Sequence, residues 1–187
     1  ALLALAGAGL LSACSGGSGG GSKPTPPASM VMDPHFQRQW YLANDGSLGI
    51  KGADINAEKA WAITQGSAAV TIAILDDGVD LGHEDLQAKI VPGFDVVDGD
   101  SIASPNPWDG HGTACAGIAA AVTGNSRGIM GIGARVKIMP VRIAQKAKGG
   151  GNWVVRAADI ETGFREAVNR GAQLLSISWV GAAPINK

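Results

Sequence analysis

The feature that most constrains the fold is an uninterrupted apolar run that ends in a pair of carboxylates. Residues 70–75 read VTIAIL, and Asp76, Asp77 and Gly78 follow directly. A continuous β-branched run of this length predicts a strand buried on both faces, as in a parallel sheet covered by helices. A carboxylate at the end of such a strand lies where α/β sheets gather their chemistry, and Gly78 lets the chain turn away sharply.

Two further runs, residues 136–143 (VKIMPVRI) and 172–179 (AQLLSISW), predict strands of the same kind. Between them, residues 112–122 form a small, apolar stretch that indicates a helix, and residues 157–170 indicate another that Gly171 ends. The second helix has apolar residues at helical spacing, namely Ile160, Phe164, Ala167 and Val168. The alternation of strand and helix predicts an α/β fold with a parallel sheet and right-handed crossovers.

A second motif, DGHGTACAG over residues 109–117, places His111 at the start of the small-residue helix. Each motif alone leaves alternatives open. Phosphatases, response regulators and nucleotide-binding folds also place an Asp after a strand, and a His at a helix start can be a cap or a surface residue. The two motifs in one α/β fold favour a catalytic pair, because small residues let the helix pack closely and fix the direction of the imidazole.

Three motifs, ILDDGVD (74–80), HEDL (83–86) and HGTACAG (111–117), resemble the Asp and His motifs of the subtilisin and kexin families of serine proteases. They occur in the chain order of subtilisin, Asp before His before Ser. The resemblance extends from about Asp33 to Gly181. It implies a three-layer, parallel-sheet, subtilisin-like fold that is incomplete, with the C-terminal part of the domain absent.

The resemblance also implies roles for individual residues. His111 is expected to be the general base of an Asp-His-Ser triad, and Asp76 to accept the other ring N–H and stabilise the imidazolium. Asp77 is expected to shape the turn or the nearby subsites. The family's Gly-Thr-Ser motif and its downstream oxyanion Asn do not occur after His111. The parent protein is therefore expected to be a serine-type endopeptidase, and this chain, read as a fragment, to be inactive.

The substrate cleft is expected at the end of the third strand. The segment Ser178, Trp179, Val180 and Gly181 matches the stretch that pairs with an extended peptide in the family. Trp108 stands where kexin-type enzymes tend to place an acidic residue, which argues against dibasic substrates. The glycines at 149–151 are expected either on the opposite rim of the cleft or in a plain mobile loop.

A structural calcium site is a further implication of the resemblance. The loop TGNSRGI (123–129) has the length and pattern of subtilisin's high-affinity loop. Carboxylate, amide and carbonyl oxygens suit Ca²⁺. The expected ligands are Asp85, Asn125 and the carbonyls of Thr123, Arg127 and Ile129, together with Asp33. The alternative is a glycine-rich surface loop without an ion.

The N-terminal residues predict export and anchoring. Residues 1–14 read as the apolar part of a signal peptide ending at Cys14 in a sequence that resembles the bacterial lipobox, and an ordinary secretory signal is the alternative. Residues 15–32 form a Gly/Ser/Pro linker, and 33–187 the peptidase portion. These features predict a lipid-anchored protein of the bacterial cell envelope, with Cys115 a lone thiol that packs as a small hydrophobe.

Composition and charge bound the function classes. With 45% hydrophobic residues and a formal net charge of -1, the chain can bury a core and has no electrostatic reason to bind nucleic acid. Protein or peptide substrates are the expected partners. A catalytically dead, cell-surface binding module is the main alternative, and a phosphoryl-transfer protein a second one that leaves HGTACAG unexplained.

Overall fold

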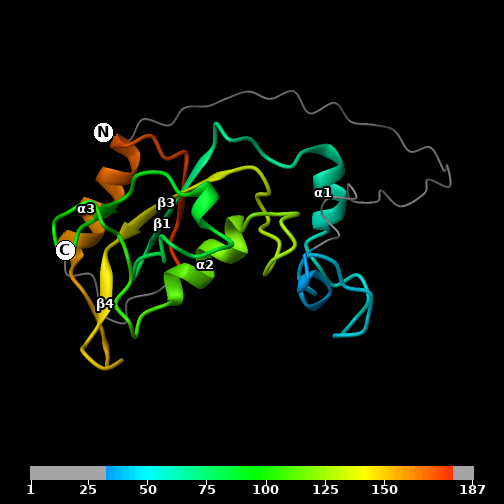
Figure 1. Cartoon of the computed structure of the whole chain (residues 1–187), viewed down its shortest axis with the longest axis horizontal. Coiled ribbons are helices and arrows are strands. Elements are labelled where there is room, and N and C mark those ends of the chain that lie inside the picture. The colour runs from blue at the N-terminus through cyan, green and yellow to red at the C-terminus, as the bar shows by residue number, and fades with distance from the viewer. Residues whose placement is uncertain (1–32, 179–187) are drawn as a thin grey trace.

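The computed structural model describes residues 33–178, and a parallel sheet in the strand order β2-β3-β1-β6 lies at its centre (Figure 1). The four strands are β1 (Thr71–Asp76), β2 (Phe94–Asp95), β3 (Lys137–Arg142) and β6 (Leu174–Ser176). β1 pairs with β3 on one side and with β6 on the other, and all of these pairings are parallel. The predicted α/β fold with a parallel sheet is confirmed.

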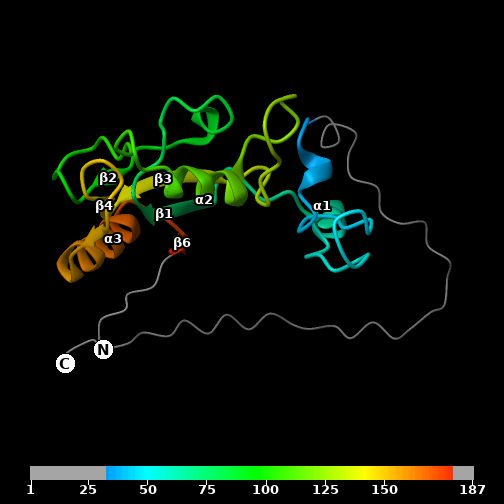
Figure 2. The same cartoon turned by 90° about the horizontal axis from the view of Figure 1, so that it is seen from below.

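The two predicted helices, α2 (His111–Ala120) and α3 (Ala157–Asn169), pack against alternating residues of the central strands. Ile74 belongs to a buried cluster with Ala116 of α2, whereas Leu75 belongs to a second cluster with Ala167 of α3. Because neighbouring residues of a strand point to opposite faces, the helices cover the two faces of the sheet. Both can be followed in Figure 2, α2 in green and α3 in orange.

The predicted apolar face of α3 is partly wrong. Ala167 is buried as expected, but Phe164 is 36% exposed and Val168 59% exposed. Gly163 lies against the sheet instead, and a Cβ built on it would be 2.4 Å from the Cγ2 atom of Ile143. The helix therefore turns its small residues to the sheet, because a close approach leaves no room for larger ones there.

β6 also differs from expectation. The run 172–179 predicts a strand buried on both faces, yet Leu174 is 53% exposed and the strand ends at Ser176. β6 is an edge strand of the described sheet, so it is paired on one side only, with β1. The chain then continues through the exposed residues Ile177 and Ser178.

A small antiparallel hairpin follows β3 directly. β4 (Ala144–Lys146) pairs with β5 (Trp153–Val155), and the glycines at 149–151 lie in the loop between the two strands. The sequence pattern did not indicate this hairpin, because its strands are only three residues long and two of the three residues of β4 are polar. It brings Trp153 alongside Lys146 in register.

The segment before the sheet packs at one end of the molecule. It contains the 3-10 helix η2 (Phe36–Arg38) and α1 (Ala57–Ile63), and a second 3-10 helix, η3 (Gln87–Lys89), follows β1. Leu42 and Trp61 form a third buried cluster with Met130.

The predicted signal peptide and linker, residues 1–32, lie outside the described residues, as does the segment 179–187. Among the helices described, none is both long enough and apolar enough to cross a bilayer.

Candidate active site

The ends of two elements bring a carboxylate and an imidazole together. Asp76 is the last residue of β1 and His111 the first residue of α2. The Nδ1 atom of His111 lies 2.9 Å from each carboxylate oxygen of Asp76, so the expected contact is present. Asp76 is only 2% exposed. Burial raises the pKa of the Asp76 carboxyl, and the hydrogen bond with His111 opposes that rise.

The second carboxylate, Asp77, makes a different set of contacts. Its Oδ2 atom accepts hydrogen bonds from the backbone N–H groups of Gly110 and His111, both at 3.1 Å. Its Oδ1 atom accepts one from the N–H of Gly112 at 2.7 Å. Asp77 was expected to shape the turn or the nearby subsites, whereas these side-chain contacts hold the start of α2.

Two glycines allow this close approach. Gly78 has a φ of +104°, and a Cβ there would lie 2.7 Å from the backbone of Ser104 and Pro105. At Gly112 a Cβ would lie 2.3 Å from the carbonyl oxygen of Gly78. The turn after β1 is thus in backbone contact with the first turn of α2 at Gly112 and with residues 104–105 at Gly78, and a side chain at either glycine would displace that neighbour.

Two further side chains touch the imidazole. The Sγ atom of Cys115, one helical turn after His111, lies 3.8 Å from Nδ1 and 3.9 Å from Nε2. Cys115 is free and half-buried. Burial raises the pKa of the Cys115 thiol, and a side-chain hydrogen bond with Ser178 opposes the rise. The thiol is therefore held neutral, which agrees with a packing role.

Trp153 of β5 is a contact that sequence reasoning missed. Its ring centroid lies 6.0 Å from that of His111 with the planes at 80°, an edge-to-face arrangement. The Nζ atom of Lys146 lies 5.1 Å from the centroid of the same ring. No local signal marks Trp153, because the contact depends on the β4–β5 hairpin folding over the start of α2.

The hairpin is tied to the loop that leads into α2. Trp108 donates its Nε1–H to the carbonyl oxygen of Lys146 at 3.2 Å, and the carboxylate of Asp109 accepts the N–H of Lys146. Trp108 therefore serves as an anchor for the hairpin. Of the residues expected to line the substrate cleft, Ser178 lies beside Cys115, while Trp179, Val180 and Gly181 fall outside the described residues.

The expected calcium loop surrounds two buried carboxylates. Asp85 accepts hydrogen bonds from the side-chain amide of Asn125 at 2.8 Å and from the N–H of Ile129 at 3.0 Å. Asp33 accepts the N–H groups of Gly124 and Ser126 at 2.7 and 2.9 Å. Burial raises the pKa of the Asp85 carboxyl, and the negative charge of Asp33 adds to that rise.

The other expected ligands, an amide and three backbone carbonyls, differ in whether their oxygen atoms are available to an ion. Asn125 directs its amide nitrogen at Asp85 and its oxygen at the N–H of Arg127, so its oxygen does not face Asp85. Within residues 33–178, Gly128 is the loop residue whose carbonyl oxygen accepts a backbone hydrogen bond, so the carbonyl oxygens of Thr123, Arg127 and Ile129 are unused, as are those of the other three loop residues. These oxygens are available to a cation, whereas Asn125 would have to reverse its amide.

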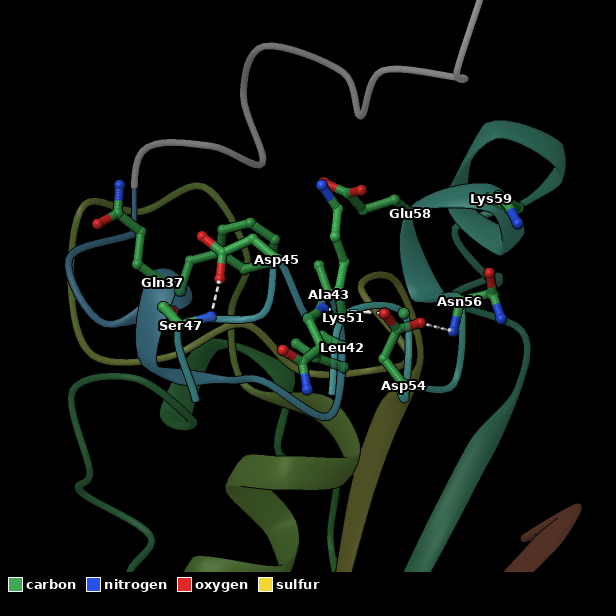
Figure 3. Close-up of a pocket in the computed structure, with 13 residues that line it drawn as sticks. Gln37, Leu42, Ala43, Asp45, Ser47, Lys51, Asp54, Asn56, Glu58 and Lys59 are labelled. Carbon is green, nitrogen blue, oxygen red and sulfur yellow. Dashed lines mark hydrogen bonds between the residues drawn. The ribbon is translucent and has the colours of Figure 1, made fainter. Parts of the chain in front are cut away.

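A separate pocket of about 570 Å³ lies in the N-terminal segment (Figure 3). Its walls carry Asp45, Lys51 and Glu58, so charges of both signs face it. Asp54 in the same wall accepts the backbone N–H groups of Asn44 and Asn56 and stabilises the loop. None of the residues expected to form the catalytic, substrate or calcium sites lines this pocket.

Comparisons with known proteins agree with this geometry. The chain is 45% identical to thermitase of Thermoactinomyces vulgaris over 149 residues, which cover 80% of the chain and 47% of thermitase. It is 36% identical to a calcium-dependent protease of Nostoc sp. over 149 residues, covering 77% of the chain and 20% of that protein.

A solved structure supports the same fold. The serine protease of Aeromonas sobria superposes with a TM-score of 0.71 at 27% identity, covering 87% of this chain and 28% of that one. The chain thus spans less than half the length of the relatives it matches. Residues 67–184 match the model of the Subtilase family. The chain, with its Asp76–His111 contact at the carboxyl end of β1, belongs to the Subtilase family.

Proposed function

We propose that the full-length protein containing this chain is a serine endopeptidase of subtilisin type, in which Asp76 and His111 are two members of the catalytic triad. The contact between Nδ1 of His111 and the Asp76 carboxylate carries the proposal. With Nδ1–H donated to Asp76, Nε2 is left as the acceptor for a serine hydroxyl proton. Asp76 then stabilises the imidazolium that forms, and the imidazolium returns the proton to the leaving amine.

The nucleophile is expected in a part of the protein beyond these 187 residues. The chain contains no Gly-Thr-Ser motif after His111. Without the serine the covalent pathway is lost, and without the oxyanion donor a further factor of ~10²–10³ in rate is lost. The 187-residue chain by itself is therefore expected to leave peptide substrates intact.

Labelling by a serine-directed fluorophosphonate tests the proposal. The full-length protein is expected to react covalently, and His111→Ala is expected to abolish the reaction because no base remains to activate the serine. Mass spectrometry of the intact protein measures the adduct. A folded wild-type protein that binds peptides but forms no adduct would favour the catalytically dead binding module instead.

We also propose that the loop 123–129 binds a calcium ion with Asp85 and Asp33. Two buried carboxylates that contact one loop repel each other, and the unused loop carbonyls supply further oxygen ligands, a donor set that suits Ca²⁺. A bound cation would offset the repulsion and hold the loop to the segment around Asp33. The calcium-dependent protease of Nostoc sp. is a relative whose name is consistent with this proposal.

Chelation tests for this calcium site in the full-length protein. EGTA is expected to lower the melting temperature of the wild type, because an ion that binds only the folded state stabilises it by mass action. Asp85→Ala should melt lower and respond no further to EGTA. Glu84→Ala is the matched control, since its side chain is exposed and its ion pair with Arg127 is worth little. Calcium sensitivity that persists in Asp85→Ala would rule out these ligands.

Anchoring at Cys14 is a separate proposal that rests on the sequence alone. The motif LSAC at residues 11–14 and the Gly/Ser linker after it support lipidation and placement at the bacterial cell envelope. Radiolabelled palmitate is expected to enter the wild-type protein and not Cys14→Ser. Equal incorporation, or none in the wild type, would contradict the anchor.

A further inference from the structure

We propose that Asp77 is a positioning residue for His111, acting through the backbone at the start of α2 while Asp76 acts on the ring. The effect of Asp77 on catalysis rests on the proposed protease function. The structural part of the inference, that Asp77 caps α2, stands on the hydrogen bonds of Asp77 alone.

The start of α2 depends on a cap supplied by another element. The first N–H groups of any helix have no partner within the helix. At α2 the N-cap position is Gly110, which has no side chain, and no side-chain cap hydrogen bond is formed there. The carboxylate of Asp77 accepts the N–H groups of Gly110, His111 and Gly112 instead. One side chain at the end of β1 therefore satisfies three consecutive donors of α2.

The cap differs from an ordinary buried ion pair. Asp77 is completely buried, and no salt bridge described within residues 33–178 includes it. Its charge faces the N–H groups and the positive end of the α2 dipole. The partners of this carboxylate thus all belong to the turn that carries His111, so its loss should be felt first at that turn.

Asp76 and Asp77 together fix His111 at two points. Neighbouring residues of a strand end direct their side chains apart, and here one carboxylate reaches the ring Nδ1 and the other the backbone N–H of the same histidine. β1 is held by β3 and β6 on its two sides, which makes it a firm support for both contacts. With the ring and the backbone both fixed to one dipeptide, the direction of Nε2 is fixed as well.

Variants of Asp77 in the full-length protein test the inference. Asp77→Ala removes both acceptor oxygens and with them all three hydrogen bonds, and kcat per active site is expected to fall ~100-fold, the loss typical of a misplacement of about 1 Å. Asn has nearly the same shape as Asp and keeps one acceptor oxygen, so kcat should fall less in Asp77→Asn than in Asp77→Ala. KM should change little in both, because Asp77 is buried. Asp80→Asn, an exposed carboxylate in the same turn, is the control and should match the wild type.

Two readouts separate positioning from general loss of structure. Active sites are counted by fluorophosphonate adducts, so unfolded protein does not enter kcat. In Asp77→Asn the acid limb of the kcat/KM profile is expected to move to lower pH, because one negative charge near the imidazolium has been removed. A wild-type kcat and an unmoved acid limb in Asp77→Asn would overturn the inference, even if Asp77→Ala fails to fold.

Amide hydrogen exchange distinguishes failure of this inference from failure of the proposed function. The N–H groups of residues 110–112 should exchange faster in Asp77→Asn than in the wild type or Asp80→Asn. Should the wild type form no fluorophosphonate adduct, the protease proposal fails while this exchange difference still reports the cap. Unchanged exchange at all three positions would refute the cap itself.

Discussion

Replacing Asp76 by Asn in the full-length protein is expected to lower kcat by about 10⁴-fold, the size of effect seen when a triad carboxylate becomes an amide. Asp76 accepts from Nδ1 of His111 and from the backbone N–H of Asp77. An Asn there can satisfy the Asp77 N–H with its oxygen and direct its NH₂ at the imidazole. The ring would then carry its proton on Nε2, where it cannot accept one from a serine.

Steady-state kinetics with a chromogenic peptide measure this loss. The number of active sites, counted by fluorophosphonate adducts, converts the measured rate into kcat per active site. KM should stay within a few-fold of the wild-type value, because Asp76 is buried behind the ring and removed from the substrate. A kcat within tenfold of the wild type would show that His111 is oriented by some other group.

The contact between Asp76 and His111 could be predicted from sequence because both residues stand at the ends of elements. The run 70–75 fixes a buried strand, and the small residues after His111 indicate a helix that packs closely on it. In a parallel sheet these two ends lie at the same edge, so a one-residue error in either boundary would leave the side chains near each other. The strand indeed starts and ends one residue later than the apolar run.

Features that depend on the packing of separate segments could not be predicted in the same way. Phe164 and Val168 fit an apolar helical face, but the close approach at Gly163 decides which face of α3 meets the sheet. Trp153 reaches His111 only because the hairpin is anchored by Trp108 and the loop before α2. Neither residue spacing nor hydrophobicity carries this information.

The proposed calcium loop lies between these cases. The pattern 123–129 indicates where the loop is, and the structure brings Asp33 and Asp85 to it from distant parts of the chain. The orientation of the Asn125 amide is a local choice that no sequence pattern specifies. Carboxylates and backbone carbonyls are symmetric or fixed acceptors, and so their roles are easier to predict than that of an amide, which can present either end.

Introducing a single methyl group at Gly112 is expected to damage the site as severely as removing a buried side chain. In Gly112→Ala the Cβ would lie 2.3 Å from the Gly78 carbonyl oxygen and 2.8 Å from the Asp76 Cβ, one neighbour in the turn after β1 and the other in its last residue. Backbone cannot yield as a flexible side chain does, so α2 must move away. We expect a destabilisation of about 1–3 kcal/mol and a ~10²-fold loss of kcat as His111 shifts from Asp76.

Gly117→Ala is the matched control, because it adds the same methyl group to the same helix at another buried glycine. Its nearest neighbour would be the flexible end of Ile129 at 3.4 Å, an ordinary contact. Alanine also favours a helix over glycine by about 1 kcal/mol, so this variant should be as stable as the wild type or more stable. Urea unfolding and kcat together decide the comparison. If Gly112→Ala matched Gly117→Ala in both, the close contact between β1 and α2 would not be what positions the imidazole.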